Sequence, residues 1–232
     1  MSPIRPKSAL MMYAASEHDS NLYYAVKFSV PDPFPYFRVG GKDIILMSDL
    51  ELGRAKKQAK VQEVLSYTDF YARTKKRGVE KPQVADVAVT FLKSHGLSQV
   101  TVPDNFNVGL ADALRQRGIR VASKPDPFFE ERVTKSAEEV RLITKSLRHT
   151  EGAIRQAEEV LRRSKIVGRK IYHRGTLVTS ETLKRVINVS LMENNCVGSH
   201  TIVASGDQGC DPHQEGSGPV WAHQSLVVDV FP

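Results

Sequence analysis

The chain has 232 residues, of which 41% are hydrophobic and 25% are charged, and its formal net charge is +7. This length is enough for one large or two modest hydrophobic cores, and we expect two domains. No stretch approaches the roughly 18 apolar residues that a membrane-spanning helix needs, and the N-terminus has neither the long apolar core nor the cleavage site of a secretory signal. The sequence therefore predicts a cytoplasmic protein with no membrane partner.

The positive charge is concentrated in three basic stretches, at residues 54–60, 73–78 and 162–170. A surface that binds nucleic acid usually has aromatic side chains among its basic residues to stack on bases, and none is interleaved here. Two of the three stretches lie on predicted helices that also carry glutamates, which is typical of a solvated helix face. We therefore expect no nucleic-acid partner.

Residues 1–124 alternate predicted strands with predicted helices. Short apolar runs predict strands at 22–28, 43–47, 99–103 and 119–123. Apolar residues at helical spacing predict helices at 49–59, 83–95 and 107–117. Such an alternation favours an α/β layered domain. Prolines and charged residues follow at 125–135, and we expect a linker there.

Residues 136–232 begin with a long predicted helix. Ser136 and Glu139 have the spacing of a capping box, in which each side chain accepts from the other residue's backbone N–H. A stripe of apolar residues at helical spacing then predicts a face that packs on a core: Val140, Ile143, Leu147, Ile154 and Leu161. A second helix is expected at about 180–194, and strands are expected at 201–204 and 225–231.

Two polar residues near the end of the chain are candidate functional residues. Asp229 lies inside an apolar run, where a buried strand has no structural use for a carboxylate and an unpaired one is costly. His213 lies in the glycine- and proline-containing loop between the two predicted strands. The simpler interpretations are a solvent-exposed loop histidine and a strand-end carboxylate that caps a turn.

The order of these features resembles the pita-bread metallopeptidases, which include aminopeptidase P, prolidase, methionine aminopeptidase and creatinase. The segment IVASGDQGCDPH ending at His213 and the segment LVVD ending at Asp229 match that family's substrate-facing histidine loop and its strand with the first metal-ligating aspartate. The segment ERVTKSAEEVRLITKSLRHTEGAI is similar to the entry helix of the catalytic domain. SEHDSNLYYAVKF and LMSDLELGRAKKQA resemble a creatinase-type N-terminal domain.

The resemblance implies a creatinase-like N-terminal domain at 1–124, a linker at 125–135 and a partial pita-bread domain at 136–232. It implies hydrolysis of N-terminal Xaa-Pro peptide bonds with two divalent metal ions (Mn, Co or Zn), Asp229 as a metal ligand and His213 as a catalytic residue that contacts substrate. It also implies a peptide substrate with proline in the second position and a homodimer in the full-length form.

The family's dinuclear site takes two aspartates, one histidine and two glutamates, and only the first aspartate is matched, at Asp229. A lone carboxylate binds divalent ions weakly because such ions take four to six ligands. We therefore expect an incomplete chain that holds no metal tightly and is inactive alone. The main alternative is a catalytically inactive peptide- or protein-binding module on the same fold. Creatinase-like hydrolysis of a small guanidino compound also stays open.

The two cysteines suggest a further, weaker alternative. Cys196, His200, Cys210 and His213 have the residue types of a tetrahedral zinc site, but their spacing fits no compact zinc finger. In a chain without an export signal we expect reduced thiols and a solvent-exposed His200 instead.

Overall fold

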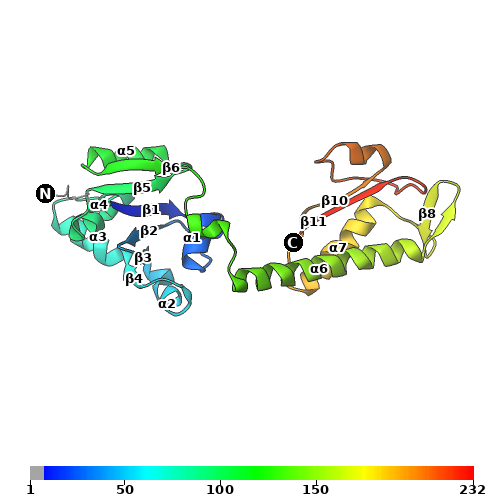
Figure 1. Cartoon of the computed structure of the whole chain (residues 1–232), viewed down its shortest axis with the longest axis horizontal. Coiled ribbons are helices and arrows are strands. Elements are labelled where there is room, and N and C mark those ends of the chain that lie inside the picture. The colour runs from blue at the N-terminus through cyan, green and yellow to red at the C-terminus, as the bar shows by residue number, and fades with distance from the viewer. Residues whose placement is uncertain (1–7) are drawn as a thin grey trace. The chain divides into compact units, whose positions relative to one another are not determined.

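The computed structural model of the chain describes residues 8–232 (Figure 1). Their internal contacts separate two units, of which the first ends at Thr134 and the second begins at Lys135. The first unit has one sheet and the second has two, and each unit has its own hydrophobic core, so each is described by itself. The mixture of helices and strands confirms the predicted α/β class.

The first unit is built on a six-stranded sheet with the order β4-β3-β2-β1-β5-β6. Its strands are β1 (Ser8–Ala14), β2 (Phe34–Val39), β3 (Lys42–Met47), β4 (Glu63–Ser66), β5 (Gln99–Pro103) and β6 (Arg120–Lys124). Its helices are α1 (Ser20–Val26), α2 (Asp49–Gln58), α3 (Tyr67–Lys76), α4 (Val84–Ser94) and α5 (Val108–Gln116). Strand β2 pairs antiparallel with both β1 and β3, and the other neighbours are parallel.

Most of the elements predicted for this unit are present. The strands expected at 43–47, 99–103 and 119–123 correspond to β3, β5 and β6, and the three expected helices correspond to α2, α4 and α5. The strand predicted at 22–28 is wrong, because this segment forms helix α1. Asp19 caps the helix by accepting from the Leu22 backbone N–H at 2.8 Å, and Leu22 and Val26 share its buried face.

Successive residues of the strands supply two separate hydrophobic layers. Met11, Phe37 and Leu46 point to one face of the sheet, where Phe37 stacks on Phe91 of α4 with ring centroids 4.2 Å apart. Their chain neighbours Met12, Tyr36 and Ile45 point to the other face. This alternation follows from the two-residue period of a strand, and it explains why the central strands read as continuous apolar runs.

Residues 125–134 of the segment that we predicted to be a linker are part of the first unit. Phe128 and Phe129 are each only 1% exposed and belong to the second of these hydrophobic layers. A short 3₁₀ helix, η1 (Glu130–Val133), follows them. The sequence suggested a linker because prolines and charges surround the two phenylalanines, but the burial of both rings anchors the segment. The boundary between the units therefore lies after Thr134.

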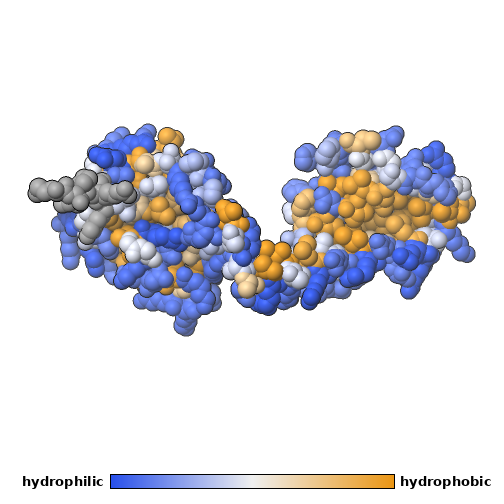
Figure 2. Space-filling model, viewed as in Figure 1, coloured by the Kyte–Doolittle hydropathy of each residue, from blue (hydrophilic) through white to orange (hydrophobic). Residues whose placement is uncertain are grey.

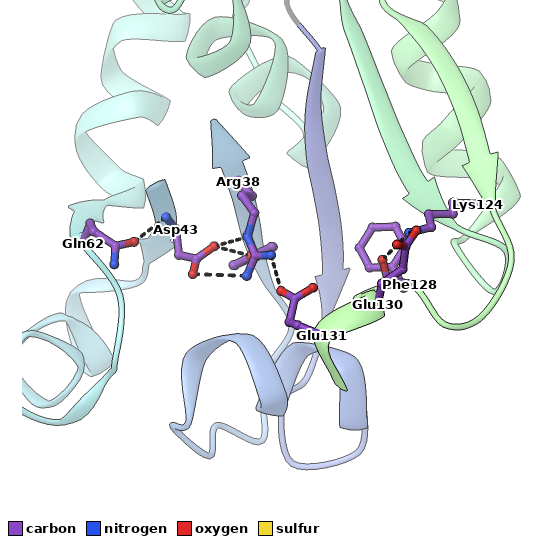
Figure 3. Close-up of polar contacts among 8 residues, drawn as sticks. Arg38, Asp43, Gln62, Lys124, Phe128, Glu130 and Glu131 are labelled. Atoms are coloured by element: carbon purple, nitrogen blue, oxygen red, sulfur yellow. Dashed lines mark hydrogen bonds and ion pairs between the residues drawn. The ribbon is translucent and has the colours of Figure 1, made fainter. Parts of the chain in front are cut away.

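Polar contacts hold the same segment to the sheet (Figure 3). The Arg38 guanidinium donates to Asp43 at 2.7 Å and to Glu131 at 2.6 Å, and it lies 4.6 Å from the centroid of the Phe129 ring. Its hydrogen bond to Glu131 holds the pKa of that carboxyl below its usual range. The Lys124 ammonium donates to the Phe128 carbonyl and to Glu130, both at 3.1 Å.

The second unit combines two helices with short sheets. Its elements are α6 (Ala137–Arg162), β7 (Lys165–Val167), β8 (Lys170–His173), β9 (Thr176–Leu177), α7 (Ser180–Glu193), β10 (Ser199–Ser205), the 3₁₀ helix η2 (Gly206–Cys210) and β11 (Leu226–Phe231). The predicted capping box of Ser136 and Glu139 is present. The core of the unit joins α6 and α7 to β10 through Ala153, Ala157, Leu183, Ile187 and Val203.

The apolar stripe of α6 is only partly buried. Its first half carries Val140, Ile143 and Leu147, which are all exposed. The prediction that the whole stripe packs on a core is therefore wrong for the first turns, because α7 and the sheets of the described unit meet only the later part of the helix. Across residues 8–232, the structure has no helix that combines the length and the hydrophobicity needed to cross a bilayer.

Candidate functional site

Asp229 lies on the open face of a two-stranded antiparallel ribbon. Strands β10 and β11 pair with Ile202 opposite Asp229 and Val203 opposite Val228. Val228 and Val230 contact the core, whereas Asp229 is exposed between Val227 and Phe231. The apolar run led us to expect a buried strand, but β11 is covered on one face only, and Asp229 lies on the other face. Figure 2 shows apolar residues gathered over the second unit. Val227 and Phe231 are among the large hydrophobic residues that are exposed.

The β10–β11 ladder is irregular at His200. The pairing shifts between Ser199 and Ile202, and the His200 backbone has a positive φ of 51°. A β-bulge redirects the side chains around it, and a positive φ at a residue other than glycine is uncommon. The His200 Nδ1 atom lies 3.1 Å from the Glu215 Oε1 atom. The irregularity thus places an imidazole beside a carboxylate of the following loop.

The loop that carries His213 is fixed along the other edge of β10. The Val203 N–H donates to the Glu215 carbonyl at 3.0 Å. The Lys184 ammonium donates to the Gly216 carbonyl at 2.9 Å. Gly216 has a φ of +81°, and a Cβ atom built there would lie 1.8 Å from the Val203 oxygen, so only glycine allows this approach.

Close to the tip of the loop, a local turn sets the position of His213. Its backbone N–H donates to the Asp211 carboxylate at 3.0 Å, and its side chain is exposed. Gln208 precedes His213 in the chain and Ser217 follows it. The Gln208 side chain makes two hydrogen bonds with the Ser217 backbone, one as donor and one as acceptor. The loop is therefore anchored on both sides of His213.

Together, the open face of the ribbon and this loop form an open cleft of about 500 Å³. Its polar lining includes His200, His213, Glu215 and Asp229, and its apolar lining is Ile202, Pro212 and Phe231. The structure thus brings both candidate residues, His213 and Asp229, into one cleft. Sequence reasoning missed Glu215. It expected a solvent-exposed His200, and this is confirmed, because the His200 side chain is 83% exposed where it lines the cleft. Neither residue lies in a recognisable motif, and no sequence signal marks the bulge that joins them.

The donors of the cleft do not make a complete metal centre. Carboxylates and imidazoles suit divalent ions. However, no group of three or more His, Cys, Asp or Glu side chains is placed to hold an ion within residues 8–232. This also excludes the alternative zinc site, since Cys196, His200, Cys210 and His213 do not converge there. Cys196 follows α7, whereas Cys210 ends η2, and both are free thiols.

Neither a family model nor a curated protein sequence matches the chain. Solved structures do match, with TM-scores of 0.69 for each of the following three. The chain is 16% identical to the prolidase from Pyrococcus furiosus, with 97% of this chain and 61% of that chain covered. It is 14% identical to the X-Pro aminopeptidase from Thermotoga maritima MSB8, with 97% and 58% covered. It is 12% identical to the Xaa-Pro dipeptidase from Bacillus anthracis, with 96% and 55% covered.

These matches extend over nearly the whole chain, which spans less than two thirds of the length of each of these structures. They show the fold: a creatinase-type N-terminal α/β domain followed by the first part of a pita-bread domain, as the sequence resemblance predicted.

Proposed function

We propose that this chain provides the N-terminal portion of a metal-dependent Xaa-Pro peptidase and that the cleft of its second unit receives the peptide. One observation carries the proposal: His213 and Asp229, the two residues that the sequence resemblance singles out, line the same cleft in a chain with the fold of Xaa-Pro peptidases. Fold alone does not determine activity, so the proposal rests on the site.

His213 has a role in the proposed reaction that needs no metal. Its side chain is exposed at a loop that is fixed on both sides, so its imidazole is free to donate a hydrogen bond to a carbonyl oxygen of a bound peptide. The apolar lining of Ile202, Pro212 and Phe231 suits a proline ring in the second position of that peptide. Both contacts would hold the scissile bond over the ribbon.

Asp229 is proposed as one ligand of a divalent ion (Mn, Co or Zn) whose other ligands come from sequence outside residues 8–232 or from a second copy in a homodimer. The described donors do not hold an ion by themselves, so no step of the reaction is assigned to one. The same observation favours a second candidate function, in which the chain binds Xaa-Pro peptides without cleaving them.

Hydrolysis assays on the protein expressed from its complete reading frame test the first function. We expect Asp229→Ala to abolish both cleavage of an Xaa-Pro peptide and divalent metal content. We expect His213→Ala to retain metal and to lower the rate about 100-fold, which is typical for loss of one donor to a reacting carbonyl. Glu193→Gln removes an exposed carboxylate at the end of α7, outside the cleft, and serves as the matched control.

Two outcomes would count against the assignment. If the His213 variant lost metal as completely as the Asp229 variant, the two roles would be wrong. If the unaltered protein bound Xaa-Pro peptides but neither held metal nor cleaved them, the binding function would replace the catalytic one.

A further inference from the structure

One basic stretch of the chain lies mainly on strands. Residues 162–178 carry six lysine and arginine side chains and no aspartate or glutamate. They include the end of α6 and the three-stranded sheet of β7, β8 and β9, of which Figure 1 labels β8. Within residues 8–232, Arg163 is the one member of the six that pairs with a carboxylate, that of Glu159. Positive charge is therefore concentrated on this part of the surface.

The pairing of the strands places basic and aromatic side chains on one face of this sheet. Lys165 pairs with Tyr172, and Val167 pairs with Lys170. On its other side, Lys170 pairs with Trp221. Residues that lie directly opposite each other in an antiparallel ladder direct their side chains to the same face. Two lysines and two aromatic residues thus share one face, which we call the basic–aromatic face: Lys165, Lys170, Tyr172 and Trp221.

The basic–aromatic face is accessible to solvent. Both of its lysines are exposed, and Tyr172 and Trp221 are partly exposed. The opposite face of the sheet is covered, since Ile171 packs against the core of the second unit. The Trp221 backbone N–H donates to Ser205 Oγ at 3.0 Å, and the Arg169 guanidinium carbon lies 6.0 Å from the centroid of the indole ring. The ring is therefore anchored beside a further cation.

A hollow of about 240 Å³ adjoins Trp221. Polar and charged side chains make up the rest of its lining: Arg169, Ser205, Asp207, Gln208 and Gln224. It shares no lining residue with the cleft around His213 and Asp229. Amide, hydroxyl and carboxylate groups match the hydrogen-bonding edge of a nucleobase, and a carboxylate can accept from the amino group of cytosine.

The sequence predicts no nucleic-acid partner because no aromatic residue is interleaved with the basic stretches. The fold removes this reason, since it brings Trp221 from a distant segment to Lys170. We infer that the basic–aromatic face binds single-stranded nucleic acid. Bases stack on its two aromatic rings, and phosphates contact the cations around them. A single strand is needed because the bases of a duplex are stacked on one another and cannot reach a ring.

Trp221 is the only tryptophan of the chain, so its fluorescence reports contact with this face directly. At about 50 mM salt, an oligodeoxycytidylate of about 12 nucleotides should quench this fluorescence on binding. An abasic oligomer with the same number of phosphates should bind at least about tenfold more weakly, because it cannot stack. The logarithm of the affinity should fall by about 0.7 per phosphate contact for each tenfold rise in salt.

Substitutions connect the binding to the basic–aromatic face, with anisotropy of a labelled oligonucleotide as the measurement. Trp221→Leu should abolish the preference for the oligomer that has bases. A Lys165→Gln, Lys170→Gln double variant should weaken binding about tenfold and reduce the salt slope by about 1.4, the value for two contacts. A Lys56→Gln, Lys57→Gln double variant removes the same charge from exposed positions of α2 and should change neither quantity. Thermal melting checks that each variant is folded.

Three outcomes would overturn the inference. Equal affinity for the oligonucleotide and the abasic oligomer would mean that the surface attracts any polyanion. Unchanged binding in the Lys165→Gln, Lys170→Gln variant would place the contact elsewhere. Binding to phosphatidylserine vesicles in the absence of binding to the oligonucleotide would assign the face to an anionic membrane. Because the face and the cleft share no residue, none of these outcomes bears on the proposed peptidase function.

Discussion

A fragment ending at Lys124 is expected to be far less stable than one ending at Thr134, although the sequence marks the intervening segment as a linker. The longer fragment keeps Phe128 and Phe129, each 1% exposed in the layer that also contains Met12 and Tyr36. Removing one buried phenylalanine side chain typically costs about 3–5 kcal/mol, and domains are stable by only about 5–15 kcal/mol. We therefore expect the shorter fragment to melt without cooperativity or at a much lower temperature.

Point substitutions in the whole chain separate two effects on stability, that of removing a buried phenylalanine ring and that of removing residues 125–134. Phe129→Ala should reduce the free energy of unfolding of the first unit by about 3–5 kcal/mol in denaturant titrations. Val108→Ala removes an exposed side chain of α5 and should change it by less than about 0.5 kcal/mol. Equal melting of the two fragments, together with a neutral Phe129→Ala, would mean that the segment is not part of the first core.

Gly216→Ala is expected to displace the loop that carries His213. A Cβ atom at this position would lie 1.8 Å from the Val203 oxygen, and the backbone has a φ of +81° that residues with side chains rarely adopt. The hydrogen bond from Val203 N–H to the Glu215 carbonyl cannot survive this clash without movement of the backbone. We expect a loss of about 3 kcal/mol or more in the stability of the second unit, and loss of peptide binding.

Gly218→Ala provides the matched control for this substitution. Gly218 also has a positive φ, of 70°, but no atom lies within 4 Å of a Cβ atom built on it. The substitution should therefore cost only the conformational strain, about 1 kcal/mol, and leave peptide binding intact. If the two alanine variants unfolded at the same denaturant concentration, close packing of Gly216 against β10 would not be what fixes the loop.

The elements that the sequence predicted well are those in which local pattern and tertiary burial agree. Helix α4 has its apolar residues on one face, and α6 starts with a capping box, so both could be predicted from the sequence. Segment 22–28 has a short apolar run that fits the period of a strand as well as that of a helix, and this is why the sequence predicts a strand there. In the structure Asp19 caps the segment, which forms a helix. The burial of Phe129 depends on partners far away in the chain, such as Tyr24 and Tyr36, which no local pattern shows.

In the candidate site, too, some features could be predicted from the sequence and others depend on tertiary contacts. The resemblance of the His213 loop and the Asp229 strand to known motifs predicted the two residues, and the structure places them in one cleft. Their chemical roles stay predictions. The exposure of Asp229 could not be predicted, because an apolar run does not reveal that one face of β11 is uncovered. Glu215 was missed because its place in the cleft depends on the approach of Gly216 to β10 and on the bulge at His200.

The most direct test of the account is hydrogen–deuterium exchange of the 232-residue chain with and without an Xaa-Pro peptide. If the cleft is the peptide site, the peptide should slow exchange in residues 199–203, 212–215 and 226–231, which form the ribbon and the loop around it. A His213→Ala, Asp229→Asn double variant should lose that protection. Protection confined to the first unit, or protection that persists unchanged in the double variant, would contradict the central claim that His213 and Asp229 line the peptide-binding cleft.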